Sequence, residues 1–113
     1  MSRSITTHVL DTSAGRPAPG IAVVLEMNTE GAWKIAGSGT TDADGRVSSL
    51  LAEGKLVAGS YRLRFETGAY FASRHVATFY PNVEITFEVR DAAQHYHVPL
   101  LLSPFGYTTY RGS

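Results

Sequence analysis

Residues 83–89 of the chain are Val-Glu-Ile-Thr-Phe-Glu-Val, in which apolar side chains alternate strictly with polar ones. Residues 60–65, Ser-Tyr-Arg-Leu-Arg-Phe, repeat this alternation, and Tyr61, Leu63 and Phe65 form the apolar set. Successive side chains of a β-strand point to opposite faces of its sheet, so each stretch predicts a strand with one buried and one exposed face. Half-buried strands are typical of antiparallel sheets, and their apolar faces must pack against a second layer.

Five further segments have the composition of strands and are separated by turn residues. The predicted strands are residues 5–10, 21–27, 33–37, 95–102 and 107–111. Turns are expected at the Pro- and Gly-rich residues 15–20, at Asp-Ala-Asp-Gly 42–45 and at Ser-Pro-Phe-Gly 103–106. One short helix is expected at residues 68–75. Many short strands with regular turns favour an all-β fold, a two-sheet β-sandwich with one short helix.

Length and composition restrict the class of protein. With 113 residues, the chain is expected to form one domain spanning residues 1–113. It has no cysteine, which excludes a disulfide framework, a thiolate zinc site and a cysteine nucleophile. Ten basic residues balance ten acidic ones, so a nucleic-acid or anionic-membrane partner is disfavoured. No apolar run approaches the ~20 residues of a membrane span, and the first residues lack a secretory signal, so we expect a soluble cytoplasmic protein.

Three of the four histidines lie in the first and the penultimate predicted strands. His95 and His97 are two residues apart and therefore share one face of their strand. In the first strand, His8 also alternates with the apolar positions. The opposite face of the penultimate strand carries the expected core residues Val98, Leu100 and Leu102. Outward histidines beside apolar residues indicate a surface covered by substrate or by a subunit, and solvated strand histidines are the alternative.

The sequence disfavours two kinds of metal site. Three imidazoles with a water can form a hydrolytic zinc site, but the spacing here fixes only two ligands. Residues 42–45 begin like a calcium loop, but Val47 and Ser49 do not continue its ligand series. A turn is therefore the better interpretation of residues 42–45.

Arg46 directly follows this turn, at the predicted start of an extended segment. A planar guanidinium at such a position can hold a carboxylate or a urea-like edge through two parallel hydrogen bonds. The alternative is an ordinary exposed arginine.

The last predicted strand belongs to a segment, residues 107–113, with two tyrosines and a single charge. An edge strand with so few charged residues favours pairing with another chain, and a two-fold dimer joined edge to edge is the simplest closed arrangement. A frayed terminus is the alternative, which the tyrosines and the preceding Pro-Phe-Gly disfavour.

Three segments together carry a family resemblance. They are Thr-His-Val-Leu-Asp-Thr at 7–12, His-Tyr-His-Val-Pro-Leu-Leu-Leu-Ser-Pro at 95–104 and Tyr-Arg-Gly-Ser at 110–113. In this combination the chain resembles the 5-hydroxyisourate hydrolase family, which is related to transthyretin, and residues 15–18 and 41–46 also fit its pattern. The resemblance extends from the first strand to residue 113. It departs at Thr108, where serine is expected, but the hydroxyl is retained.

The resemblance implies a transthyretin-like (prealbumin-like) sandwich of two four-stranded sheets with one short helix. It also implies a homotetramer, a dimer of dimers, with active sites in clefts across the dimer–dimer interface. No cofactor and no metal are implied. The implied reaction is hydrolytic opening of 5-hydroxyisourate to 2-oxo-4-hydroxy-4-carboxy-5-ureidoimidazoline.

The resemblance also implies roles for individual residues. His8 and His97 would share the work of general base and proton shuttle, because imidazole titrates near neutral pH. Arg46 would bind the polar edge of the ring and stabilise developing negative charge, and Tyr110 would hydrogen-bond the substrate. Ser113 would orient a histidine or the water through its hydroxyl or a terminal carboxylate. A transthyretin-like carrier of small molecules without catalysis is the alternative, and the joint presence of these residues disfavours it.

Overall fold

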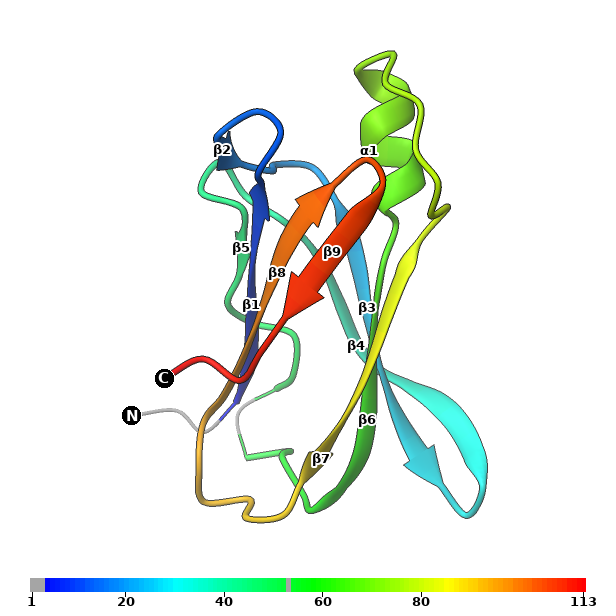
Figure 1. Cartoon of the computed structure of the whole chain (residues 1–113). Coiled ribbons are helices and arrows are strands. Elements are labelled where there is room, and N and C mark those ends of the chain that lie inside the picture. Colours follow the sequence, from blue (N-terminus) through cyan, green and yellow to red (C-terminus); the bar gives the residue numbers. More distant parts are fainter. Residues whose placement is uncertain (1–3, 53) are drawn as a thin grey trace.

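The computed structural model describes residues 4–52 and 54–113, so the first three residues of the N-terminal stretch analysed above lie outside the description. Two sheets pack face to face, with a short helix at one end (Figure 1). The elements are β1 (Ile5–Asp11), β2 (Arg16–Pro17), β3 (Ala22–Thr29), β4 (Ala32–Thr40), β5 (Arg46–Val47), β6 (Gly59–Phe65), α1 (Thr67–Ser73), β7 (Val83–Val89), β8 (Tyr96–Ser103) and β9 (Gly106–Thr109). The predicted all-β, two-sheet fold with a short helix is confirmed.

The number of strands in one of the sheets differs from the expected four. One sheet has five strands, in the order β2-β1-β8-β9 with β5 also paired to β1, and the other has the order β4-β3-β6-β7. The additional strands β2 and β5 are two residues each, too short to show an alternating pattern. Strand β4 continues to Thr40 through small residues that carry no apolar signal, and β9 ends two residues earlier than predicted.

Alternate residues of the facing strands form the core. Tyr61, Leu63 and Phe65 of β6 are at most 1% exposed, as the alternation predicts. The expected core residues of β8 are also buried: Val98, Leu100 and Leu102. Pro99 lies between them on the opposite face and is nevertheless buried, because residues that follow β9 cover it.

Helix α1 begins one residue earlier and ends two residues earlier than predicted. It packs Tyr70 and Phe71 against the core. Within the described part of the chain, no helix is long and apolar enough to cross a membrane.

The pairing of β1 with β8 decides where the functional residues meet. The two strands run parallel over their whole length, from Ile5 opposite Tyr96 to Asp11 opposite Leu102. Strand β8 then turns back into β9 at Ser103 and Gly106, as the turn chemistry predicts. The first strand of the chain therefore lies beside the penultimate one, and the last strand lies on the other side of the penultimate strand (Figure 1).

Candidate active site

Three of the residues that the sequence singles out, His8, Arg46 and His97, lie on the outer face of the five-stranded sheet. His97 is in register with Thr6, and His8 is in register with Arg46 of β5. Residues paired across a sheet share a face, and so do residues two apart along a strand. These four side chains are therefore on one face. Their neighbours Ile5, Thr7, Val9 and Val98 are buried on the other face.

The ring of His97 is half-buried and held from two sides. Its Nδ1 atom lies 2.8 Å from Oγ1 of Thr6, which makes a hydrogen bond between β1 and β8. On the other side, Gly112 lies so close that a Cβ atom on it would be 2.6 Å from Cδ2 of His97. The contact with Thr6 engages Nδ1 and leaves Nε2 as the ring nitrogen available for chemistry.

The surroundings of His97 favour its neutral form. Burial lowers the pKa of the His97 imidazole, and the nearby positive charges of Arg46, His8 and His95 lower it further. A neutral imidazole near pH 7 can accept a proton, which is what a general base requires.

The turn before Arg46 has the geometry predicted for residues 42–45. Oδ1 of Asp42 accepts hydrogen bonds from the backbone N–H groups of Asp44 and Arg46, and Gly45 has φ 74°. The backbone N–H of Val9 donates to the carbonyl of Gly45 at 2.7 Å, which fixes the turn against β1. The carboxylate of Asp42 is therefore used within the turn, and Arg46 is exposed beside His8.

The segment after β9 is held against β8 by specific contacts. The N–H of Gly112 donates to the carbonyl of His97 at 2.8 Å. Nη2 of Arg111 donates to Oε1 of Gln94 at 2.8 Å, and the guanidinium lies over the ring of Tyr96, 4.5 Å from its centroid. These contacts hold the segment as far as Gly112. Ser113 is the next residue and is exposed.

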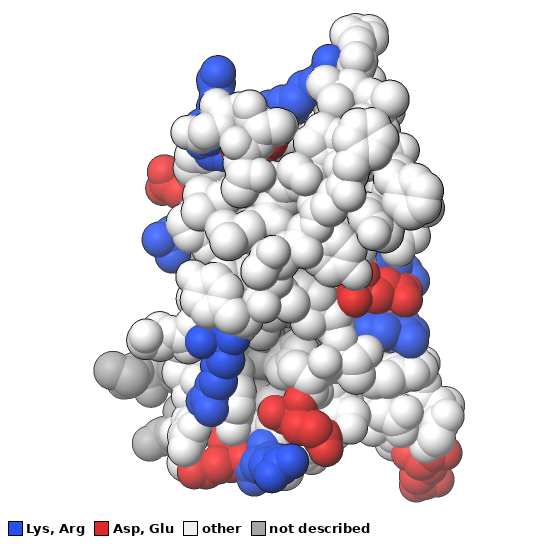
Figure 2. Space-filling model, viewed as in Figure 1, with Lys and Arg blue, Asp and Glu red and all other residues white. Residues whose placement is uncertain are grey.

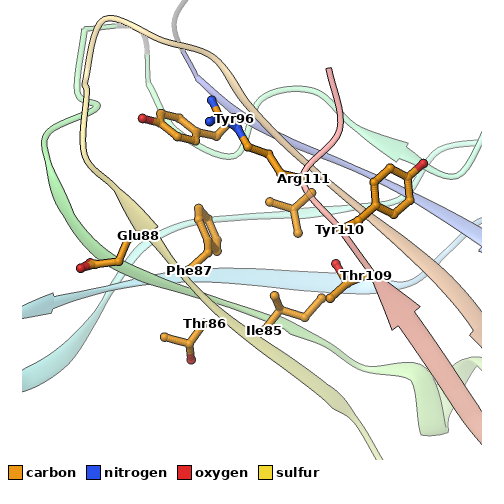
Figure 3. Close-up of a pocket in the computed structure, with 9 residues that line it drawn as sticks. Ile85, Thr86, Phe87, Glu88, Tyr96, Thr109, Tyr110 and Arg111 are labelled. Atoms are coloured by element: carbon orange, nitrogen blue, oxygen red, sulfur yellow. The ribbon is translucent and has the colours of Figure 1, made fainter.

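A cavity of about 330 Å³ opens between the two sheets, at the edge formed by β7 and β9. It is lined by Ile85, Thr86, Phe87, Glu88, Tyr96, Val98, Thr109, Tyr110 and Arg111. Figure 3 shows Arg111 extending toward Tyr96, whereas the ring of Tyr110 points away from Ile85 and Phe87. His8, Arg46 and His97 do not line this cavity. Tyr110 does line it, two residues before Gly112, which contacts His97.

Sequence reasoning singled out His8, Arg46 and His97 but missed their positioning partners. Thr6 carries the hydroxyl that contacts His97, and the available signal was its position two residues before His8 on the same strand face. Gly112 belongs to the motif at residues 110–113, which does not by itself indicate a contact with His97. In residues 4–52 and 54–113, no three His, Asp or Glu side chains are grouped as ligands of a metal ion.

Replacing Gly112 with alanine should lower the activity of the site by up to about 100-fold, because displacement of a positioned group by about 1 Å has effects of this order. The new Cβ would be 2.6 Å from His97 Cδ2 and 3.2 Å from Pro99 Cγ, so the segment must move away from the ring. Gly106→Ala is the matched control, since its Cβ would meet nothing closer than 3.7 Å. Equal turnover rates for the two variants would contradict the positioning role of Gly112.

The chain is similar to proteins of known activity over almost its whole length. A family model described as the HIUase/Transthyretin family matches residues 5–112. The 5-hydroxyisourate hydrolase of Salmonella typhi is 46% identical over 112 residues, which cover 99% of this chain and 82% of that protein.

Two solved structures are similar in fold. Klebsiella pneumoniae 5-hydroxyisourate hydrolase has a TM-score of 0.83 at 38% identity, over 96% of this chain and 98% of that one. Sea bream transthyretin in complex with thyroxine has a TM-score of 0.91 at 34% identity, over 96% and 93% of the two chains. The transthyretin-like form of the sandwich is thereby confirmed.

Proposed function

Because the chain belongs to the HIUase/Transthyretin family, we propose that it is a 5-hydroxyisourate hydrolase whose active site is the outer-face cluster of His8, Arg46 and His97 with residues 110–113. The observation that carries the proposal is the register of the strands in the five-stranded sheet. It groups two imidazoles and a guanidinium on one face, as a hydrolytic site for a polar ring requires.

The chemistry of ring opening matches these groups. A water molecule attacks the ring carbonyl, Nε2 of His97 accepts the water proton, and the carbonyl oxygen becomes negatively charged. The guanidinium of Arg46 stabilises that charge. The carbon–nitrogen bond then breaks, the leaving nitrogen takes a proton delivered by the histidines, and the product is a carboxylate. His8, in register with Arg46, is placed for the second proton transfer.

Tyr110 and Ser113 complete the proposed site. Tyr110 is 56% exposed, so its hydroxyl is available to hydrogen-bond a substrate. Ser113 is the residue after Gly112, which pairs with His97. Its hydroxyl would orient the water or the imidazole. Neither residue takes part in bond making in this scheme.

The carrier function of a transthyretin is the second candidate, since the fold accommodates both. Two features favour the hydrolase. Among the solved structures, identity to the Klebsiella pneumoniae hydrolase is 38%, against 34% to sea bream transthyretin. The outer-face cluster also provides a base and an anion-stabilising group, which binding of an apolar ligand does not require.

The proposed assembly is a homotetramer, a dimer of dimers, with active sites in clefts across the dimer–dimer interface. In a single chain, the outer face of the five-stranded sheet is not covered by another layer. A second subunit would cover it and form the other side of the cleft. On the face seen in Figure 2, uncharged side chains cover the middle and upper right, whereas charged side chains lie along the two edges and across the lower third. Exposed aromatic residues suited to such contacts are Phe79, Phe105, Tyr107 and Tyr110. A single domain and a cytoplasmic location remain predictions.

The test is the ultraviolet decay of 5-hydroxyisourate, generated in place from urate by urate oxidase. We expect the protein to accelerate the decay well above the buffer rate and to sediment as a tetramer. A folded tetramer without acceleration would contradict the hydrolase function and favour the carrier.

The acid limb of the pH profile of kcat/KM should lie below the ordinary imidazole value of about 6.5. Burial and the charges of Arg46, His8 and His95 lower the pKa of His97, so the ring stays neutral to lower pH than a free imidazole does. Activity should therefore persist through pH 6.5 and be lost only as the pH falls further. Half-loss of kcat/KM above pH 6.5 would contradict His97 as the titrating base.

A further inference from the structure

The hydroxyl of Thr6 contacts two imidazoles at once. Its Oγ1 lies 2.8 Å from Nδ1 of His97 and 3.1 Å from Nε2 of His95. A hydroxyl has one proton to donate and lone pairs with which to accept, so it can donate to one ring while it accepts from the other. The protonation of the two rings is therefore coupled through Thr6.

Two arrangements satisfy both contacts. In the first, His95 donates from Nε2 to Thr6, and Thr6 donates to Nδ1 of His97, so the His97 proton is on Nε2. In the second, His97 donates from Nδ1 to Thr6, and Thr6 donates to Nε2 of His95. Only the second leaves a free electron pair on Nε2 of His97, which is the state that a base needs.

We propose that Thr6 and His95 form a relay that holds His97 in the tautomer with a free Nε2 and carries its proton to solvent. The inference rests on the proposed function, because it assigns His97 as the base. His95 is exposed, so a proton that reaches it can leave to water, whereas the ring of His97 is half-buried.

The proton transfers balance along this relay. Nε2 of His97 takes a proton from the attacking water, which makes the ring an imidazolium. The Nδ1 proton of His97 then moves to Oγ1 of Thr6 while the Thr6 proton moves to Nε2 of His95. His97 is neutral again with its proton on Nε2, and His95 is an imidazolium that releases its Nδ1 proton to solvent, which gives the first arrangement. When Nε2 of His97 gives its proton to the leaving nitrogen, the transfers run in reverse: the Thr6 proton moves to Nδ1 of His97, the Nε2 proton of His95 moves to Oγ1 of Thr6, and His95 takes a proton from solvent at Nδ1. The second arrangement, with a free Nε2 on His97, is thereby restored.

The fold places the relay without needing the hydroxyl for stability. Thr6 is in register with His97 because β1 and β8 run parallel, and the N–H of Tyr96 donates to the carbonyl of Ser4 at the start of this pairing. A valine at position 6 would have the same shape and suit a strand equally well. The groups that face His97 from neighbouring elements are Thr6 and His8 on β1, Arg46 on β5, His95 before β8 and Gly112 after β9.

Three variants test the relay: Thr6→Val, which removes the hydroxyl; Thr6→Ser, which keeps it; and His95→Gln, which keeps a hydrogen-bonding group that cannot carry a proton. The first readout is the ¹⁵N chemical shifts of the His97 ring nitrogens, assigned by comparison with His97→Asn. The second is the pH profile of kcat/KM. A melting curve for each variant establishes that it folds.

In Thr6→Val the His97 proton should no longer be confined to Nδ1, and kcat/KM should fall about 10-fold, as expected for loss of one hydrogen bond. The acid limb of this variant should move to lower pH, because the lost hydroxyl no longer accepts a hydrogen bond that stabilises the His97 imidazolium. In His95→Gln it should move to higher pH, since a positive neighbour is removed. Thr6→Ser should restore both readouts.

Thr6→Val with wild-type ring-nitrogen shifts, or Thr6→Ser that fails to restore them, would overturn the relay. The shifts are measured on the folded protein without turnover. An inactive wild type would therefore overturn the proposed function separately from the tautomer control by Thr6.

Discussion

Replacing His97 with asparagine should lower kcat for 5-hydroxyisourate by roughly 10²–10⁴-fold, the usual contribution of a general base. Asparagine can retain a hydrogen bond to Thr6, but it cannot accept a proton from water near neutral pH. The half-buried position of His97 means that solvent groups cannot easily replace it. The measurement is the ultraviolet decay rate at saturating substrate, with the concentration of folded protein established by circular dichroism.

His75→Asn is the matched control for this substitution. His75 is exposed at the end of α1, with φ 58°, a conformation that asparagine adopts more readily than most residues. The control variant should fold normally and keep wild-type activity. Full activity in His97→Asn would remove the central assignment of the site.

Replacing Arg46 with glutamine should lower kcat by roughly 10²–10³-fold, the cost of losing one group that stabilises an oxyanion. The effect should also reach His97. Arg46 is one of the positive charges that lower the pKa of that ring, so its removal raises the pKa and moves the acid limb of kcat/KM to higher pH. Loss of rate together with this shift would support direct proximity of Arg46 to His97 in the working enzyme.

Arg16→Gln is the control for Arg46→Gln. Both arginines are exposed first residues of two-residue strands that pair with β1, but Arg16 is in register with Asp11 and Arg46 with His8. Arg16→Gln should leave the rate and the acid limb unchanged. Equal losses in the two variants would mean that the effect arises from general surface charge and not from the site.

The fold could be predicted from the sequence because most of its strands bury one face. Strict alternation at 83–89 coincides with the observed bounds of β7, and the alternation at 60–65 falls within one residue of β6. Strands β2 and β5 could not be found this way, since two residues define no period. Their pairing depends on tertiary contacts, such as the hydrogen bond from Val9 to Gly45.

The candidate site could be predicted only as a set of residue types. Outward orientation of His8 and His97 follows from alternation, and the register adds that Arg46 faces the same side. The contacts around His97 were not predictable, because they join residues far apart in the chain. Thr6 and His97 are 91 positions apart, and no local pattern specifies that their strands run parallel and in this register.

The parallel pairing of β1 with β8 also has a consequence for biosynthesis. Chains are made at roughly 5–20 residues per second, so about 5–18 seconds separate the synthesis of Thr6 from that of His97. The four-stranded sheet joins β3, β4, β6 and β7 through pairings made from residues 22–89, so it can assemble first on the nascent chain. Throughout that interval the edge of β1 that later pairs with β8 has no partner, although β2 and β5 can already pair with β1. Chaperone capture or aggregation during translation should therefore depend most on this first strand.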